Sequence, residues 1–581
     1  MRHSKSILIT LGHNSSVIFF QPGSNPIGYE EERLSGIKSD SSYPILALEK
    51  VLSQLQHSQI TGCNVFISHW FDHFELEAFP KKYFKSEHFN RLVEEYEWCI
   101  IPLTSQFTHH DAHAYSTLAF SENFPTGVIG DKHFIVVDGF GNNQEVISIY
   151  KQLDDGRSSL LPIKRVYGYE NSLGLLYQYA TSFCGMKENQ DEYKFLGYES
   201  DIKKVLSSVQ IENLDIQTYK FSMEFMSNCL QVHNEKPVAS NDTIIDFVKL
   251  ATTKEKMHSM FSHVLKTAFN DVESNISIDD TLDRNRTVIG YFAQACLEQC
   301  LLRIIKKYDM QNVYLSGGCF LNVKLNKLIL DSVKGCVCVN PLSGDQGAAI
   351  GMFRKYTNTQ FDFADLCFGV RDRVELAMAT KVMLINESIY NYSHETELIN
   401  AASYFIGEGF IVNILQGDME FGPRALCNTS TLALPTAENT AYINKVNERN
   451  EVMPMAPVML KAKAAKLLKE TDTRRVIGSN KYMIITHDFI GPDTENYRGI
   501  LHTKPKQPGY TCRPQIIYDA NSNIGRILSD LSHMTDCLIN TSFNTHGRPI
   551  LYAFESAIED FRKQKRKDSE QRLILLILCK K

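Results

Sequence analysis

Two histidines and two aspartates have the spacing and setting of a metal site. His109 and His113 are four residues apart, so on a helix their imidazoles lie on one face, whereas His110 points elsewhere. This spacing alone is more typical of helix histidines without a ligand role. The balance changes because Asp138 and Asp345 each end a strand-like run at a glycine turn. Such nitrogen and oxygen ligands suit Fe²⁺, Mn²⁺ or Zn²⁺ and leave positions open for phosphate oxygens.

Arginines in the C-terminal half indicate a pocket for an anion. Arg424 follows a Gly-Pro turn, and a guanidinium fixed in this way suits a bidentate grip on phosphate or carboxylate. Arg449 and Arg513 add two cations, and a strand end at Asn540 and Ser542 adds an amide and a hydroxyl. For Arg424 by itself, a surface salt bridge explains the residue equally well.

Two glycine turns could bring backbone close to a nucleotide. Gly317 and Gly318 follow a strand-like run and precede a helix start at Asn322, which is the geometry of many phosphate sites but a weak signal alone. The turn at residues 12–16, which contains His13, also offers backbone N–H groups and small hydroxyls to a phosphate.

The elements that position these residues alternate between strands and helices, which predicts an α/β fold. In the first unit we expect a helix over 46–56, mostly helical sequence over 200–310, and strands at 7–11, 17–20, 64–67, 134–137, 313–316 and 336–339. Periodicity weakens around 355–375, so a domain boundary is expected between residues 358 and 359. In the second unit we expect helices near 399–405 and 457–469 and strands near 410–415, 482–486 and 536–540. No internal repeat is visible.

Composition and charge exclude several classes of protein. A chain of 581 residues with 43% hydrophobic residues forms two to four packed domains. Its net charge of −6 gives no general attraction to nucleic acid or an anionic membrane. The longest strictly apolar run, 573–579, is far shorter than the roughly 20 residues that span a bilayer. The polar turn at residues 12–16 interrupts the apolar stretch near the N-terminus, so a signal peptide is not expected. Fourteen cysteines without a CxxC motif predict free thiols and a cytoplasmic location, or the host cytoplasm for a viral chain. The basic run 562–567 is expected to be a solvated helix face.

In order along the chain, these motifs resemble the NodU/CmcH O-carbamoyltransferase family, which includes nodulation-factor, cephalosporin and tobramycin O-carbamoyltransferases. The resemblance rests on Gly12-His-Asn-Ser-Ser, Glu31-Glu-Arg33, His109-His-Asp-Ala-His113, Val137-Asp-Gly, Ser172-Leu-Gly, Asp191-Glu-Tyr-Lys-Phe-Leu-Gly197, Leu315-Ser-Gly-Gly, Gly344-Asp-Gln-Gly, Glu420-Phe-Gly-Pro-Arg-Ala-Leu and Asn540-Thr-Ser-Phe-Asn544. It implies an N-terminal ASKHA domain (actin-like ATPase, TsaD-like) at 1–358 and a YrdC-like domain at 359–581. The second would form carbamoyl adenylate from ATP and carbamoyl phosphate, and the first would transfer the carbamoyl group to an acceptor hydroxyl.

The resemblance also implies a role for each matching residue. The metal ligands would be His109, His113, Asp138 and Asp345, and His13 would be the general base for the acceptor hydroxyl. The nucleotide contacts would be Glu192, Lys194, Gly317, Gly318 and Asn322. The carbamoyl phosphate and ATP contacts of the second domain would be Arg424, Ser430, Arg449, Arg513, Asn540 and Ser542. The metal would be divalent, with Fe²⁺ favoured over Mn²⁺ and Zn²⁺, and a homodimer is common in the family.

The sequence departs from the family pattern mainly in the second domain, at Thr429, Asn447, Asn450, Met453 and Gly509. Most of these positions lose a charge that could contact phosphate or metal, so a nucleotide-binding regulatory or degenerate protein without carbamoyl transfer is the alternative to an active enzyme. A metallohydrolase is the third, weakest hypothesis, because the histidine pair lacks the glutamate of HExxH. The acceptor stays open between a small molecule, a sugar, and a hydroxymethylated nucleotide or DNA base of the kind suspected for some viral relatives.

Overall fold

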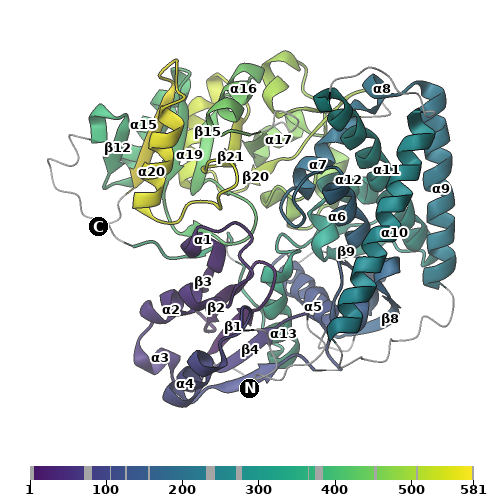
Figure 1. The fold of residues 1–581 in the computed structure, drawn as a ribbon. Coiled ribbons are helices and arrows are strands. Elements are labelled where there is room, and N and C mark those ends of the chain that lie inside the picture. The colour runs from purple at the N-terminus through teal and green to yellow at the C-terminus, as the bar shows by residue number, and fades with distance from the viewer. Residues whose placement is uncertain are drawn as a thin grey trace.

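The computed structural model describes residues 5–578 apart from 71–80, 105, 125–126, 155–157, 231–242, 270–277, 364, 373–383, 450–454 and 505–507. The fold is mixed α/β, as predicted, with two five-stranded sheets and a seven-stranded sheet among the described residues. In Figure 1 the seven-stranded sheet and its helices lie above the first five-stranded sheet, and long helices form the right side of the molecule.

The first sheet is built from the N-terminal hundred residues. Its strands are β1 (Ser6–Thr10), β2 (Ser16–Phe20), β3 (Ile27–Glu30), β4 (Asn64–Ser68) and β5 (Cys99–Pro102), in the order β3-β2-β1-β4-β5. β1 is antiparallel to β2 and parallel to β4. The predicted strands at 7–11, 17–20 and 64–67 are confirmed, and the predicted helix 46–56 is α2 (Ile45–Ser53).

The second sheet repeats the topology of the first. Its strands are β6 (Lys132–Val137), β7 (Glu145–Gln152), β8 (Leu160–Tyr167), β9 (Asn312–Ser316) and β10 (Val337–Val339), in the order β8-β7-β6-β9-β10. As in the first sheet, three antiparallel strands are followed by two parallel ones. No repeat is visible in the sequence. Two sheets with the same strand order need buried apolar positions in each strand but not the same residues at those positions.

Two helices, α5 (His109–Ser121) and α13 (Ala348–Thr357), pack between the two sheets. Apolar side chains of both sheets and both helices form one buried cluster there. The helices approach closely at Gly351, where a Cβ atom would lie 1.8 Å from the carbonyl oxygen of Ala112. This contact fixes the helix that carries the histidine pair.

Long helices cover the outer face of the second sheet. They are α9 (Ser208–Leu230), α10 (Thr243–Phe269) and α11 (Ile278–Lys307), as the helical sequence over 200–310 predicts. By length and hydropathy alone, the segment Leu282–Lys307 could cross a bilayer, but 78% of its apolar window is buried inside the protein. The described part of this helix is therefore a buried helix of the protein core.

The third sheet forms the C-terminal half. Its strands, in spatial order, are β12 (Ile389–Tyr392), β22 (Leu573–Leu578), β13 (Ile411–Leu415), β15 (Thr429–Ala433), β21 (Leu538–Ser542), β16 (Ala456–Leu460) and β20 (Gln515–Ile517). α15 (Glu395–Gly407) and α19 (Asn523–Asp530) pack in one apolar cluster, and α16 (Ala437–Val446) and α20 (Phe554–Lys565) pack in another. Strands near 410–415 and 536–540 and the helix near 399–405 are confirmed.

Two predictions for this half are wrong. The segment 457–469 is β16 followed by α17 (Lys461–Leu467), because the apolar strand runs directly into a helix-forming Lys-Ala sequence. The apolar run 482–486 is buried without forming a strand, and the nearby strand β17 (His487–Phe489) begins after it.

The cysteines and the basic run fit their predicted surroundings. The described cysteines are free thiols, and most are buried. In the basic run, Arg562 pairs with Glu387 and Lys563 with Glu559, and these side chains are largely exposed. The run is therefore a solvated, ion-paired helix end.

Candidate active site

The histidine pair lies at the N-terminal end of α5, where the local sequence fixes the start of the helix. The Thr108 hydroxyl accepts from the Asp111 backbone N–H at 3.3 Å, and the Asp111 carboxylate accepts from the Thr108 N–H at 2.7 Å. This reciprocal cap makes the helix begin at His109. The His109 N–H is held by the side-chain oxygen of Asn142 at 2.7 Å.

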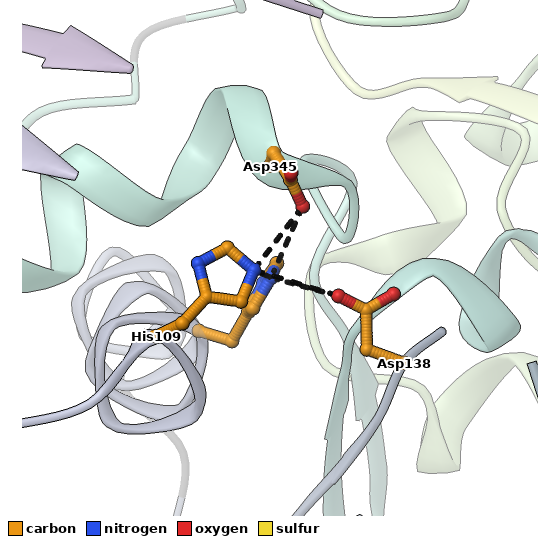
Figure 2. A group of neighbouring side chains, drawn as sticks. His109, Asp138 and Asp345 are labelled. Carbon is orange, nitrogen blue, oxygen red and sulfur yellow. Dashed lines mark hydrogen bonds and ion pairs between the residues drawn. The ribbon is translucent and has the colours of Figure 1, made fainter. Parts of the chain in front are cut away.

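The predicted metal ligands come together around one point (Figure 2). His109 Nε2 lies 3.3 Å from Asp345 Oδ1 and 3.5 Å from Asp138 Oδ2. His113 Nε2 lies 3.5 Å and 3.6 Å from the same two oxygens and 3.1 Å from His109 Nε2. Ligands about 2.1 Å from a metal lie roughly 3.4 Å apart in a tetrahedral arrangement, so these four side chains fit a divalent cation.

The charges of the cluster explain its protonation. Burial would lower the pKa of His109, but the carboxylates of Asp345 and Asp138 outweigh burial and raise that pKa to about 10. Conversely, burial would raise the pKa of Asp345, but the two imidazoles hold it well below its ordinary value. A divalent cation would take the place of the protons that the histidines hold between the carboxylates.

The glycine turn after β9 supports one of the carboxylates. Gly318 donates its backbone N–H to Asp138 Oδ1 at 3.1 Å. Gly317 has a φ of 95°, and a Cβ there would lie 2.4 Å from the Val137 carbonyl oxygen. The predicted glycine turn therefore binds the Asp138 carboxylate directly, while Asn322 caps α12 (Val323–Ser332) by accepting from the Leu325 N–H.

A single cavity of about 500 Å³ is lined both by the two carboxylates of the His2Asp2 cluster and by the residues of the predicted anion pocket. Of the predicted site residues, it is lined by His13, Asp138, Glu192, Lys194, Gly318, Asn322, Asp345, Arg424, Arg449, Arg513, Asn540 and Ser542. His109 and His113 are buried and do not line it themselves, but their ring nitrogens lie within 3.6 Å of the two carboxylates that do. Gly317 and Ser430 do not line it, and the Ser430 hydroxyl instead accepts from the Cys427 N–H at 3.0 Å.

Two arginines at one end of the cavity have no acidic partner within the described part of the chain. Arg424 makes no ion pair there, and its Nε atom is buried without a hydrogen-bond partner. Burial lowers the pKa of Arg424 to about 10. Burial also lowers the pKa of Arg513 strongly, and the positive charge of Arg424 lowers it further. Two neighbouring cations without a counter-charge favour an anion between them.

Two family models match the chain, one described as "Carbamoyltransferase N-terminus" over residues 6–353 and one as "Carbamoyltransferase C-terminus" over residues 403–569. The chain belongs to the carbamoyltransferase family. It is similar to an uncharacterized protein of Methanocaldococcus jannaschii, with 25% identity over 95% of each chain. It is also similar to the 3'-hydroxymethylcephem-O-carbamoyltransferase of Amycolatopsis lactamdurans, with 28% identity over 41% of this chain and 44% of that one.

A solved structure of HypF from T. kodakarensis also matches this carbamoyltransferase, with 12% identity, a TM-score of 0.31, and coverage of 61% of this chain and 48% of that one. A TM-score this low does not establish a shared fold. The fold is therefore defined by the strand order described above. The family membership makes the chain a transferase, as its motifs predict.

Two other predicted residues that line the cavity, Arg449 and Asn540, also make hydrogen bonds within the C-terminal half of the carbamoyltransferase. Arg449 donates to the Ser542 carbonyl oxygen at 2.8 Å and to the Asn544 side-chain oxygen at 3.2 Å, which orders the end of β21. The Asn540 amide donates to the Ala425 carbonyl oxygen at 3.0 Å. Asn540 therefore holds the residue next to Arg424, and Arg449 holds the end of β21.

The departures from the family pattern have different structural settings. The Thr429 hydroxyl donates to Glu420 at 2.9 Å and accepts a hydrogen bond from Arg371, so a guanidinium reaches this position from elsewhere in the chain. Asn447 is buried, and Gly509 has a φ of 117°; neither lines the cavity. Asn450 and Met453 lie outside the described residues.

Sequence reasoning missed several cavity residues. Trp70 and Phe140 line it beside His13, with ring centroids 5.3 Å apart at an interplanar angle of 87°. His546 lies 2.8 Å from the predicted residue Lys194, between their side-chain nitrogens, and so joins the two halves of the chain across the cavity. Single aromatic or histidine residues far apart in sequence carry no spacing signal that could have identified them.

Proposed function

We propose that this carbamoyltransferase is an ATP-dependent O-carbamoyltransferase that works in two steps. In the first, carbamoyl phosphate, ATP and water give carbamoyl adenylate, phosphate and pyrophosphate at the end of the cavity that holds Arg424 and Arg513. In the second, an acceptor hydroxyl attacks the carbamoyl carbon beside Asp138 and Asp345, and AMP leaves. The single observation that carries the proposal is the one cavity lined by both sets of residues.

The chain's own residues have separate tasks in this scheme. Arg424 and Arg513 bind the anionic substrates, because no described acid competes for their charge. His13, exposed in the turn between β1 and β2, takes the proton of the acceptor hydroxyl. A divalent cation held by His109, His113, Asp138 and Asp345 would neutralise the phosphate of the leaving AMP.

The fold assignments belong to the same proposal. The repeated order of the two N-terminal sheets supports an ASKHA domain, and the seven-stranded sheet with its helices supports a separate YrdC-like domain. A division between residues 358 and 359 is supported by the end of α13 at Thr357, which is followed by a left-handed Asn358.

We propose a ring-bearing molecule as the acceptor. Trp70 and Phe140 form an aromatic wall next to His13 and Asp138. Such a wall can stack on the face of a sugar or a planar heterocycle and turn its hydroxyl toward the carboxylates. A hydroxymethylated nucleotide or DNA base and a homodimer stay predictions.

The test is to supply ATP, carbamoyl phosphate and Fe²⁺ or Mn²⁺ and to measure pyrophosphate release. We expect release that requires carbamoyl phosphate, and mass spectrometry of candidate acceptors should find a carbamoyl increment that the His109→Ala variant does not form. ATP binding by calorimetry without pyrophosphate release under any metal condition would instead support the regulatory, non-transferring alternative. Turnover of the His109→Ala variant equal to the parent would contradict the metal-dependent second step.

A further inference from the structure

Two residues of the first sheet region hold the loop that carries Arg424. Glu30 ends β3, and Arg33 lies in the next helix, α1 (Glu31–Ser35). Glu30 Oε2 accepts from the Gly422 backbone N–H at 2.9 Å, and Arg33 Nη2 donates to the Gly422 carbonyl oxygen at 2.6 Å. Both backbone polar groups of Gly422, two residues before Arg424, are therefore bound by side chains nearly 400 positions away in the sequence.

The Glu30–Arg33 pair is itself rigid. Arg33 Nη2 and Nε lie 2.9 Å and 3.2 Å from Glu30 Oε2, and Arg33 Nη1 lies 2.8 Å from Glu32 Oε1. Glu32 in turn accepts from the Ser39 backbone N–H at 2.7 Å. Glu30 is 2% exposed and Arg33 is 6% exposed, so neither side chain can turn to water without leaving a charge buried and unpaired.

The same loop is closed from the other side by Glu420. Its Oε1 accepts from the backbone N–H groups of Leu426, Asn428 and Thr429 at 2.8 to 2.9 Å. The loop thus has two carboxylate anchors, one from its own half and Glu30 from the N-terminal half. Arg424 lies between the anchors, and its unpartnered Nε shows that the loop itself does not satisfy the guanidinium.

We propose that Glu30 and Arg33 are positioning residues for the anion site, so that the substrate pocket of the C-terminal half is complete only when the N-terminal half binds its loop. The inference rests on the proposed function of Arg424 in binding an anionic substrate. It assigns a positioning role to the region of the Glu31-Glu-Arg33 motif. It also links the two proposed steps, because a shift of β3 or α1 would move Gly422 and with it Arg424.

The test compares variants of Glu30 and Arg33 in the full chain. Glu30→Ala removes the acceptor for the Gly422 N–H, whereas Glu30→Gln keeps an oxygen there. We expect Glu30→Ala to raise the Kd for inorganic phosphate and the KM for carbamoyl phosphate about 10-fold, with Glu30→Gln closer to the parent. Metal content should stay at the parent value in both variants, because Glu30 does not contact the metal ligands.

A matched control and a second variant keep the result interpretable. Glu122→Gln alters a half-buried carboxylate that is also paired with an arginine, Arg354, at 2.7 Å but that, unlike Glu30, does not line the cavity; it should leave phosphate binding unchanged. Arg33→Lys is the second variant, for use if Glu30→Ala does not fold. It keeps the positive charge but loses the several N–H donors of the guanidinium, and it should show the same rise in KM. Parent-like phosphate binding in the folded Glu30 variant, or in Arg33→Lys, would overturn the inference. A parent protein that binds no phosphate at all would overturn the proposed function of Arg424 as well.

Discussion

Gly318 donates its backbone N–H to Asp138 Oδ1 at 3.1 Å, although 180 residues separate the two positions. The bond occupies one carboxylate oxygen, so the other oxygen, Oδ2, faces the two histidines. β6 and β9 are parallel neighbours, and the turn after β9 thereby orients Asp138, the predicted metal ligand that follows β6. Interactions of this kind tune a metal site without touching the metal.

The first prediction concerns Gly318→Ala. A Cβ at this position would lie 2.9 Å from Asp138 Oδ1, so the variant should push the carboxylate aside without straining the backbone of the turn. We expect metal affinity to fall about 10-fold to 100-fold, measured by competition with a chromophoric chelator. Asp345→Asn, which alters a ligand directly, should lose more affinity. Equal affinity in Gly318→Ala and the parent would contradict the supporting role of the turn.

The second prediction concerns the unpaired cations. Arg424→Met replaces a partly buried guanidinium, whose Nε has no hydrogen-bond partner among the described residues, with an apolar chain of similar length. Without ligand, the variant should be more stable than the parent by about 1–2 kcal/mol, because an uncompensated charge has left the cavity. Phosphate at 100 times its Kd should stabilise the parent by about 2.7 kcal/mol and the variant much less.

Thermal melts with and without phosphate check both parts of this prediction. Lys563→Met is the control, because Lys563 is a solvated residue paired with Glu559 and should respond to phosphate as the parent does. A variant that is less stable without ligand and equally stabilised by phosphate would show that Arg424 has a structural role instead.

The cluster of two histidines and two aspartates could be predicted from sequence because each of its residues carries a local signature. His109 and His113 share a helix face, and Asp138 and Asp345 end strand-like runs at glycines. The N-terminal strands were predictable for the same reason, since their apolar runs are bounded by turns. The segment 457–469 was mistaken for one helix because β16 passes into α17 without a turn residue.

The contacts that complete the site depend on tertiary structure alone. Glu30 and Gly422 are 392 positions apart, and nothing local to either residue indicates the bond between them. Likewise, the guanidinium that reaches Thr429 comes from Arg371, and sequence comparison at position 429 alone suggests only a lost charge. Departures from a family motif are therefore best judged by what fills the space around them.

The third prediction concerns the aromatic wall. Gly12 lies so close to Trp70 that a Cβ there would be 2.4 Å from the indole Nε1, so the indole packs directly on the turn that carries His13. Trp70→Ala should raise the KM for a ring-bearing acceptor about 10-fold, which corresponds to the loss of one stacking contact. Trp70→Phe should lose less, and pyrophosphate release without acceptor should stay at the parent rate.

Fluorescence gives an independent readout of the same wall. The chain has two tryptophans, and the other, Trp98, is 6% exposed and donates to the Ile60 carbonyl oxygen at 3.0 Å. Titration of the Trp98→Phe variant with a ring-bearing alcohol should therefore change the emission of Trp70. An unchanged emission together with an unchanged KM in Trp70→Ala would contradict acceptor stacking at this wall.

The fourth prediction concerns Glu31, whose carboxylate caps α2. Its oxygens accept from the backbone N–H groups of Leu46 at 3.2 Å and Ala47 at 2.9 Å. Burial nevertheless raises the pKa of Glu31 from 4.5 to about 7. Because the folded pKa lies above the unfolded one, the contribution of Glu31 to stability is complete below pH 4.5 and is lost as the pH rises through 7.

Glu31→Gln removes the titrating carboxyl group, so a comparison with the parent should show whether this group stabilises the protein less as the pH rises. As the pH rises from 4.5 to 8, the free energy of unfolding of the variant should increase relative to that of the parent by roughly 1–3 kcal/mol. This range is below the full value of the pKa shift because solvent screens part of the effect. Denaturant midpoints of parent and variant at pH 5, 6, 7 and 8 measure the difference. Glu94→Gln serves as the control, because Glu94 is an exposed residue. A pH-independent difference for Glu31→Gln would show that the buried carboxyl keeps its ordinary pKa, held there by its two backbone donors.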